Sequence, residues 1–364
     1  MATPTEFYQL IEIIRQREVT VRRFSRKLVA AAAMLTAAGA MAVATNSATA
    51  ADGKKPVTIA LFVAIQANPV EQAIINDFME VAKKDGAAKF VVFDSNNSVQ
   101  KEIANCNDAI ASKQYDAFAL KSVAGPPLMN CAKKAMKAGI PVVAFGNALG
   151  PDPNTAKRQI KGLSGSVIEL AKVNGITIAK LVHEACQAKH AHPCKVIYTY
   201  GPLAFDWASI SRKYFEETVK KDYKNIHILT EGANNFDPNT ARTLIKSLVQ
   251  AHPDVDVVAS DGDLGAVGVI EGLKDMGKKV GKGGILVTGG AFSKIGKGLI
   301  DNGEMFGSTC LMPTTEAETS AKYSIRAARH EKIAHPDVEV CDLFSPTGNA
   351  PITAANVSKF TPQF

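Results

Sequence analysis

The sequence predicts an α/β protein of two doubly wound lobes, each with a parallel sheet covered by helices on both faces. Short apolar, β-branched runs alternate with segments of helical periodicity, which is typical of parallel strands joined by helical crossovers. The alternation occurs twice, which favours two similar lobes over one very wide sheet. Without a leader of 50 residues, about 314 (364 − 50) residues remain, more than one core usually supports.

The first series of alternating elements opens with VTIALFVAI at 57–65, whose β-branched apolar residues predict a buried strand. Helical spacing with a glycine stop follows at 68–86. The remaining elements are expected as strand 89–95, helix 98–113, strand 115–122, helix 126–138 and strand 140–147.

The second series is expected to begin with a helix at 164–186 and a strand at 194–201. It continues with helix 207–221, strand 226–232, helix 238–251, strand 255–262, helix 263–276 and strand 284–290. Right-handed crossovers between parallel strands are expected throughout.

Residues 1–50 carry the features of a secretory signal peptide. Four basic residues between positions 22 and 27 precede an uncharged stretch from Leu28 to Val43, and Ala48-Thr49-Ala50 follows. A basic start, an apolar middle and an A-x-A ending predict export, with cleavage before Ala51. A membrane helix is the alternative, but the stretch has about 16 residues where a span needs roughly 20.

The charge that remains after this cleavage is small. The mature chain would hold 36 (42 − 6) basic and 32 (35 − 3) acidic residues, a net charge of +4. So small an excess does not favour a nucleic-acid partner.

Six cysteines in an exported chain predict disulfides. They are Cys106, Cys131, Cys186, Cys194, Cys310 and Cys341. The histidines between 183 and 192 raise the alternative of a metal site. No fixed ligand spacing and no CxxC pair accompany them, so we expect no metal.

Polar and aromatic residues follow the predicted strands, and these are the candidates for ligand binding. In doubly wound sheets, ligands bind beyond the carboxyl ends of the strands. The candidates are Gln66, Asn68, Asp94, Asn147, Phe205, Trp207, Asn235, Phe236, Asp261 and Asp263. Asp94 has the alternative role of capping a turn and Asp263 that of a helix N-cap, while the aromatic residues have the alternative of packing.

The glycine-rich segments give no catalytic or nucleotide-binding motif. GDLGAVG at 262–268 has the spacing G-x-x-G-x-x-G, which differs from the dinucleotide fingerprint. GLSGS around Ser164 lacks the spacing of a nucleophile elbow. The sequence therefore predicts a binding protein without cofactor rather than an enzyme.

Four segments carry a likeness to a known family. They are VTIALFVAIQANPV, VVFDSNNSVQKEIANCNDAIASKQYDAFAL, AHPDVDVVASDGDLGAVGVIEGLK and LIDNGEMFGSTCLMP. In this order they resemble the ribose-type periplasmic sugar-binding proteins. The resemblance implies two lobes joined by three hinge strands, with ligand in the cleft between them. The N-terminal lobe would comprise 56–163 plus 312–340, and the C-terminal lobe 164–311 plus 341–364.

The resemblance also implies a function. Such a protein captures a sugar or polyol in the periplasm, as a monomer without catalysis, and delivers it to an ABC permease in the inner membrane. Aromatic faces stack on the sugar ring while planar polar side chains satisfy its hydroxyls. The alternatives are the same fold with a non-sugar ligand (a signal, nucleoside or aromatic metabolite), the effector domain of a sugar-responsive repressor, and a secreted enzyme.

The chain departs from the family's pattern at several ligand positions. Val70 and Glu71 replace the two aromatic residues that often follow Asn-Pro in the family. Gly146-Asn147 replaces an Asp-Arg pair, and Leu311 replaces a hinge glutamine. These losses argue against ribose and favour a larger or partly apolar sugar, unless Glu71, Lys121 or Asn235 restores the polar contacts. Trp207→Ala and Asp263→Ala are each expected to weaken binding at least tenfold, roughly 1.4 kcal/mol, with the fold intact.

Cysteines that are nearest partners are expected to pair. Cys106–Cys131 would join two helices of the first lobe, and Cys186–Cys194 would close a turn. Cys310–Cys341 would join two of the hinge strands that the resemblance implies.

Overall fold

The computed structural model describes residues 53–67 and 69–364. The predicted signal peptide and Asn68 lie outside the described residues. In this part of the chain no helix is both long and apolar enough to cross a membrane.

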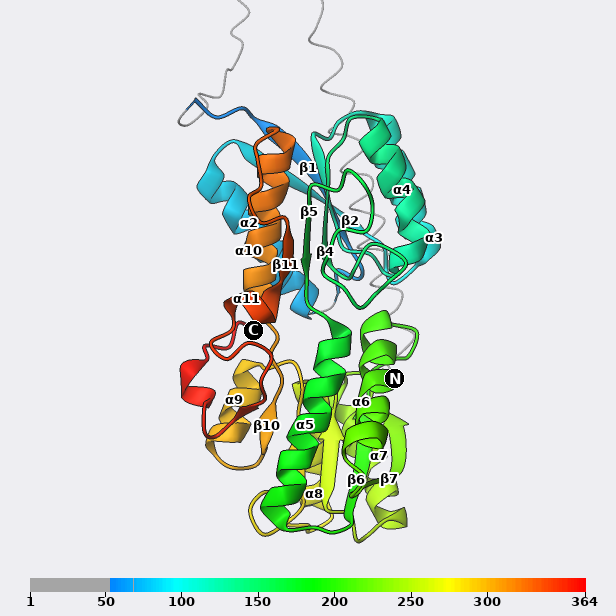
Figure 1. Ribbon diagram of the computed structural model, residues 1–364, viewed down its shortest axis with the longest axis vertical. Helices are drawn as coiled ribbons and strands as arrows, with labels where there is room; N and C mark the ends of the chain where they lie inside the picture. The colour runs from blue at the N-terminus through cyan, green and yellow to red at the C-terminus, as the bar shows by residue number, and fades with distance from the viewer. Residues whose placement is uncertain (1–52, 68) are drawn as a thin grey trace, which may run out of the picture. The chain divides into compact units, whose positions relative to one another are not determined.

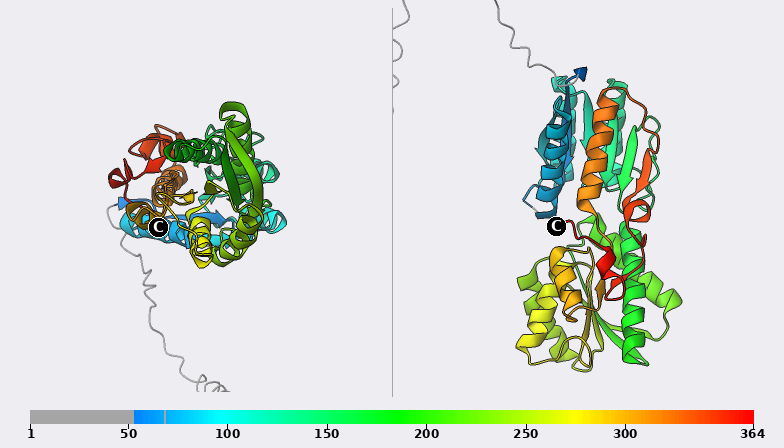
Figure 2. Two further views of the ribbon diagram at one scale, coloured as in Figure 1. Left: turned by 90° about the horizontal axis from the view of Figure 1, so that it is seen from below. Right: turned by 90° about the vertical axis from the view of Figure 1, so that its left-hand side faces the viewer.

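The first sheet has six strands in the order β11-β5-β4-β3-β1-β2, and all of its pairings are parallel. Its strands are β1 (Val57–Val63), β2 (Ala88–Asp94), β3 (Ala117–Leu120), β4 (Val142–Gly146), β5 (Gly165–Ile168) and β11 (Asp337–Glu339). The helices α2 (Pro69–Asp85) and α10 (Pro313–Ala328) lie side by side on one face, and α3 (Val99–Ser112) and α4 (Gly125–Lys137) cover the other (Figures 1 and 2).

Strand β1 illustrates why both faces are covered. Its side chains alternate between the faces, so Ile59 and Leu61 pack with Phe78 of α2, whereas Phe62 packs with Leu128 of α4. All five side chains are fully buried. Burial of each such side chain contributes about 1.5–3 kcal/mol, which explains the apolar run that marked this strand in the sequence.

The second sheet repeats this arrangement, with the order β12-β10-β9-β8-β6-β7. Its strands are β6 (Cys194–Tyr200), β7 (Ile226–Ala233), β8 (Val257–Ser260), β9 (Leu286–Thr288), β10 (Gly307–Ser308) and β12 (Ile352–Thr353). Only β12 is antiparallel to its neighbour. One face packs on α5 (Ala171–Lys189) and α6 (Asp206–Asp222), and the other on α7 (Pro238–Ala251), α8 (Asp263–Asp275) and α9 (Lys294–Asp301).

The chain passes between the two sheets three times. It leaves the first sheet after β5 through Glu169 and Leu170, and it returns after β10 through residues 309–312. It leaves again after β11 through the short helix α11 (Val340–Phe344), on the way to β12 and the short helix η2 (Val357–Lys359). These three crossings stand where hinge strands were expected.

The helix expected at 164–186 is wrong at its start. Residues 165–168 form β5 instead, and α5 begins only at Ala171. The strand is four residues long and includes Gly165 and Ser166, which dilute its apolar character, and the N-cap Leu170 offers no side-chain cap to mark the helix start. Because β5 pairs with β4, residues 165–168 extend the first sheet rather than the second.

All three predicted disulfides are confirmed. The Cα atoms lie 6.3 Å apart in Cys106–Cys131, 5.8 Å in Cys186–Cys194 and 6.2 Å in Cys310–Cys341. The first pair joins α3 to α4, as expected. The third joins two crossings, although Cys341 lies in α11 rather than in a strand.

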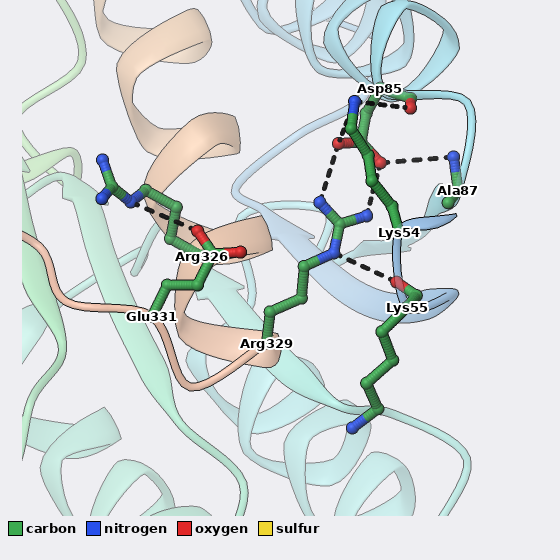
Figure 3. Close-up of polar contacts among 7 residues, drawn as sticks. All are labelled: Lys54, Lys55, Asp85, Ala87, Arg326, Arg329 and Glu331. Atoms are coloured by element: carbon green, nitrogen blue, oxygen red, sulfur yellow. Dashed lines mark hydrogen bonds and ion pairs between the residues drawn. The ribbon is translucent and has the colours of Figure 1, made fainter. Parts of the chain in front are cut away.

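A half-buried arginine lies at the end of the first lobe opposite to the strand exits. The Arg329 guanidinium donates to both carboxylate oxygens of Asp85 at 2.6 and 2.8 Å, and to the Lys55 carbonyl at 3.0 Å (Figure 3). Lys54 Nζ reaches the Asp85 carbonyl at 3.3 Å. The hydrogen bonds from Arg329 lower the pKa of Asp85. Together, these contacts of Arg329 and Lys54 join the ends of α2 and α10 to the segment before β1.

Candidate ligand-binding site

The strand order places a topological switch point in each sheet. The winding reverses between β1 and β3 in the first sheet, and between β6 and β8 in the second. Ligands of doubly wound sheets bind at such switch points, beyond the carboxyl ends of the strands. The residues that follow these four strands are therefore the ones to compare with the sequence-based candidates.

Two of the first-lobe candidates hold loops together. The Asp94 Oδ1 atom accepts the backbone N–H groups of Gln66 at 3.1 Å and Asn96 at 2.9 Å, so it joins the loops after β1 and β2. Asn147 donates from its side chain to the Ser122 carbonyl at 2.7 Å. Gln66 is exposed. The turn-capping alternative for Asp94 thus has direct structural support.

Asn235 and the three aromatic candidates follow strands of the second sheet. Asn235 and Phe236, shortly after β7, both adopt left-handed backbone conformations, with φ of 56° and 55°. The Phe236 ring lies over Gly201, where a Cβ atom would stand 2.1 Å from the ring's Cζ. The glycine after β6 therefore gives the half-buried ring its place. Trp207 is also half-buried, in the first turn of α6, directly after the N-cap Phe205 and Asp206.

Asp261 is a buried carboxyl with one free oxygen. It follows β8, and its Oδ2 atom accepts the Gly201 N–H at 2.8 Å. Within residues 53–67 and 69–364 no donor reaches Oδ1. Burial raises the pKa of Asp261 to about 7. A buried carboxyl with a free acceptor at the switch point is suited to receive a hydroxyl of a ligand.

Asp263 lies in a different environment, because protein donors reach both of its oxygens. Oδ2 accepts the Ser293 N–H at 2.8 Å and the Ser293 hydroxyl at 2.9 Å, and Oδ1 accepts the Ser308 hydroxyl at 2.7 Å. Burial raises its pKa to about 7. Asp263 thus ties α8 to the start of α9 and to β10.

Four charged side chains gather at the carboxyl edge of the first sheet, and we call them the Lys121 cluster. Lys121, directly after β3, forms an ion pair of 2.5 Å with Glu71 of α2. Glu316 of α10 and Glu169 after β5 complete the cluster, and each of the four is less than 10% exposed. Although burial alone would lower the pKa of Lys121, Glu71 and Glu316 raise it. Burial raises the pKa of Glu316 to about 7.

Glu169 connects the cluster to the crossings. Its Oε1 atom accepts the Met312 N–H at 2.6 Å, so the first crossing is bonded to the second. Burial, and then repulsion from Glu316, raises the pKa of Glu169 well above its usual range. Beside it lies a small pocket formed by the crossings, α5 and α6. The pocket is lined by Glu169, Leu170, Val173, Asn174, Thr177, Trp207, Thr309, Cys310, Glu339, Cys341 and Asn349.

A family model described as a periplasmic binding protein domain matches residues 59–332. The chain belongs to this family. The ribose import binding protein of Escherichia coli is 24% identical over 292 residues, which cover 80% of this chain and 92% of that protein. The corresponding protein of Haemophilus influenzae is 23% identical over 299 residues, 82% of this chain and 94% of its own length.

Solved structures of ABC transporter solute-binding proteins share the fold. A solute-binding protein of Bacillus halodurans with bound myo-inositol superposes with a TM-score of 0.69 at 15% identity, covering 86% of this chain and all of that one (100%). One from Actinobacillus succinogenes with bound D-allose gives 0.66 at 19% identity, covering 84% and 100%. The family model confirms the predicted family, and the solved structures confirm the predicted fold of two parallel-sheet α/β lobes. Periplasmic binding proteins capture solutes without chemical conversion, so the chain is a binding protein and not an enzyme.

Sequence reasoning found most strand exits of this periplasmic binding protein but missed two members of the Lys121 cluster. Glu71 and Lys121 were expected only as residues that could restore polar contacts, and Glu169 and Glu316 were not among the candidates. Glu169 could have been found as a strand-exit residue, because it is a lone acidic residue directly after β5. The incorrect helix start at 164 concealed it.

We expect Asp263→Ala to lower the free energy of unfolding by about 3 kcal/mol, because three buried donors of Ser293 and Ser308 lose their acceptor. The sequence led us to expect that this variant would keep its fold intact, whereas the contacts of Asp263 lead us to expect a loss of stability. Urea denaturation measures the loss, and Asp263→Asn, which keeps an acceptor, should lose less. Equal stability of the alanine variant and the wild type would contradict the structural role.

Proposed function

We propose that this periplasmic binding protein captures a sugar or polyol between its lobes and delivers it to an ABC importer. One juxtaposition carries the proposal: the Phe236 ring and the Asp261 carboxyl group, whose Oδ1 is free of protein donors among the described residues, both lie against Gly201 at the switch point of the second sheet. An aromatic face suits the C–H face of a sugar, and a buried acceptor suits its hydroxyl. The named function of the ribose import relatives supports this class of ligand.

Ligand capture in this proposal works by closure about the three crossings. A ligand that contacts both lobes favours the closed state in proportion to its differential affinity for the two states. Crossings of a few residues between rigid α/β lobes suit a hinge motion. The Met312–Glu169 hydrogen bond joins two of the crossings, so they would move as a unit.

Export and partners complete the proposal. The predicted signal peptide would direct the chain to the periplasm and be removed before Ala51, and the intact mass of the secreted protein tests this step. There the protein would act as a monomer and present its ligand to a permease of the inner membrane.

A thermal-shift panel of pentoses, hexoses, polyols and nucleosides tests the ligand class, because a ligand that binds only the native state raises Tm. We expect a hexose, a substituted sugar or a larger polyol to raise Tm, and ribose to have no effect below millimolar concentration. The reason is that this chain lacks the polar side chains that the family carries at the positions of Gly146 and Leu311. A shift caused only by nucleosides or aromatic metabolites would overturn the sugar proposal.

Trp207→Ala is expected to weaken binding of the sugar found in that panel at least tenfold, roughly 1.4 kcal/mol, through loss of an aromatic face beside the crossings. Calorimetry measures the affinity. Tyr214→Ala changes another aromatic residue of α6 and is the matched control. If both variants bind like the wild type, Trp207 is a packing residue.

A further inference from the structure

The Glu71–Lys121 pair spans the switch point of the first sheet. Glu71 lies in the first turn of α2, the helix that follows β1, and Lys121 is the first residue after β3. These are the two strands between which the winding reverses. The 2.5 Å ion pair therefore bridges the place where a doubly wound sheet binds its ligand.

The pair has a site built around it. Gly146, the last residue of β4, has φ of 73°, and a Cβ atom on it would lie 2.6 Å from Lys121 Cε. The absence of a side chain at Gly146 thus gives the Lys121 stem its path across the sheet edge. Glu71 is 5% exposed and Lys121 8%.

One oxygen of the pair has no partner. Glu71 Oε1 bonds Lys121, whereas Oε2 is buried and has no hydrogen-bond donor in the part of the chain that the structure describes. A buried carboxylate oxygen without a donor is unfavourable, because it has lost its hydration and gained no hydrogen bond in exchange. A hydroxyl removes this cost because it can donate to Oε2 while its oxygen accepts from the Lys121 ammonium.

The charges around the pair select against anions. Within the Lys121 cluster one ammonium faces three carboxyl groups, those of Glu71, Glu169 and Glu316. Glu316 also leaves its buried Oε1 without a partner among the described residues. Glu71 already neutralises Lys121, so an anionic ligand would lie beside the Glu71 carboxylate with no free positive charge to offset its own burial in a site of low dielectric.

We propose that the Glu71–Lys121 pair is the first lobe's anchor for the ligand, and that it selects a neutral hydroxyl-bearing end and rejects acidic sugars. This inference rests on the proposed function. It adds that the ligand is uncharged and that Glu71 and Lys121 distinguish it from an acidic sugar.

The test compares the tightest neutral sugar of the panel with its uronic acid. The wild type should bind the neutral form at least about 100-fold more tightly. The double variant Glu71→Gln/Lys121→Met replaces both members of the ion pair by neutral side chains of similar shape, so neither member is left behind as an unpaired ion. It should bind the neutral sugar at least about tenfold more weakly and discriminate less than about tenfold against the acid.

Glu318→Gln/Lys322→Met removes an exposed pair of α10 at 2.8 Å and should leave both affinities unchanged. No binding of any sugar by the wild type would refute the proposed function itself. Tighter binding of the acid by the wild type would by itself overturn the proposal that the Glu71–Lys121 pair anchors a neutral ligand. Unchanged affinity and unchanged discrimination in the double variant would also overturn it. The Tm of the double variant without ligand shows whether the variant is folded.

Discussion

Glu102→Gln is expected to raise the free energy of unfolding by roughly 4 kcal/mol at pH 7.5 and by only about 1 kcal/mol at pH 5. Glu102 lies in the first turn of α3 and is 0% exposed. Its Oε2 atom accepts the Val123 N–H at 3.0 Å, but Oε1 has no partner in the described chain. Burial raises its pKa to about 8 despite that hydrogen bond.

The sign follows from proton binding. An unfolded glutamate has a pKa of about 4.3, so between pH 4.3 and 8 the folded state holds a proton that the unfolded state has released. Stability is then lost as the pH rises through this window, at about 1.4 kcal/mol per pH unit. Glutamine stays neutral in both states, so its advantage grows with pH.

Urea denaturation of both proteins at pH 5 and pH 7.5 measures the effect. The decisive quantity is the difference in unfolding free energy between the variant and the wild type, and how much it changes from pH 5 to pH 7.5. Other buried groups such as Asp261 and Glu316 titrate equally in both proteins and cancel in this difference. Glu80→Gln, an exposed substitution in α2, is the control. A Glu102→Gln advantage that is the same at both pH values would show that Glu102 is charged in the native state.

The fold could be predicted from the sequence because its determinants are local. Apolar runs such as that of β1 bury both faces of a strand, and this need is directly visible as composition. Strand β5 lacked this mark. It is short and contains Gly165 and Ser166, and its pairing with β4 and β11 makes it a strand.

The candidate site could be predicted only to the level of position. Strand exits identified Asp261 and Asp263 equally well, and no sequence pattern indicated that Ser293 and Ser308 would satisfy one of them and leave the other with a free oxygen. Such partners come from elements far apart in the chain. Glu316 illustrates the same limit, because it approaches Lys121 only through the packing of α10 against the first sheet.

Replacing Cys310 and Cys341 together by serine is expected to lower the free energy of unfolding by about 4 kcal/mol. The disulfide closes 31 residues, and loop-closure entropy in the unfolded chain predicts a loss of this size. It also joins the second crossing to α11 beyond β11, so its loss frees two of the three connections between the lobes. Urea denaturation of the purified variant measures the change.

The other two disulfides supply the matched comparison, because the three closed loops do not overlap in sequence and their effects should be separable. The serine pair at Cys186 and Cys194, which close only 8 residues, should lose about 2.5 kcal/mol. The pair at Cys106 and Cys131, with 25 residues, should lose about 3.5 kcal/mol. If the short loop cost as much as the longest, unfolded-chain entropy would not be the main source of stabilisation. A loss at Cys310 and Cys341 well above the others would instead place the additional stabilisation in the native crossings, where the disulfide lines the pocket beside Trp207.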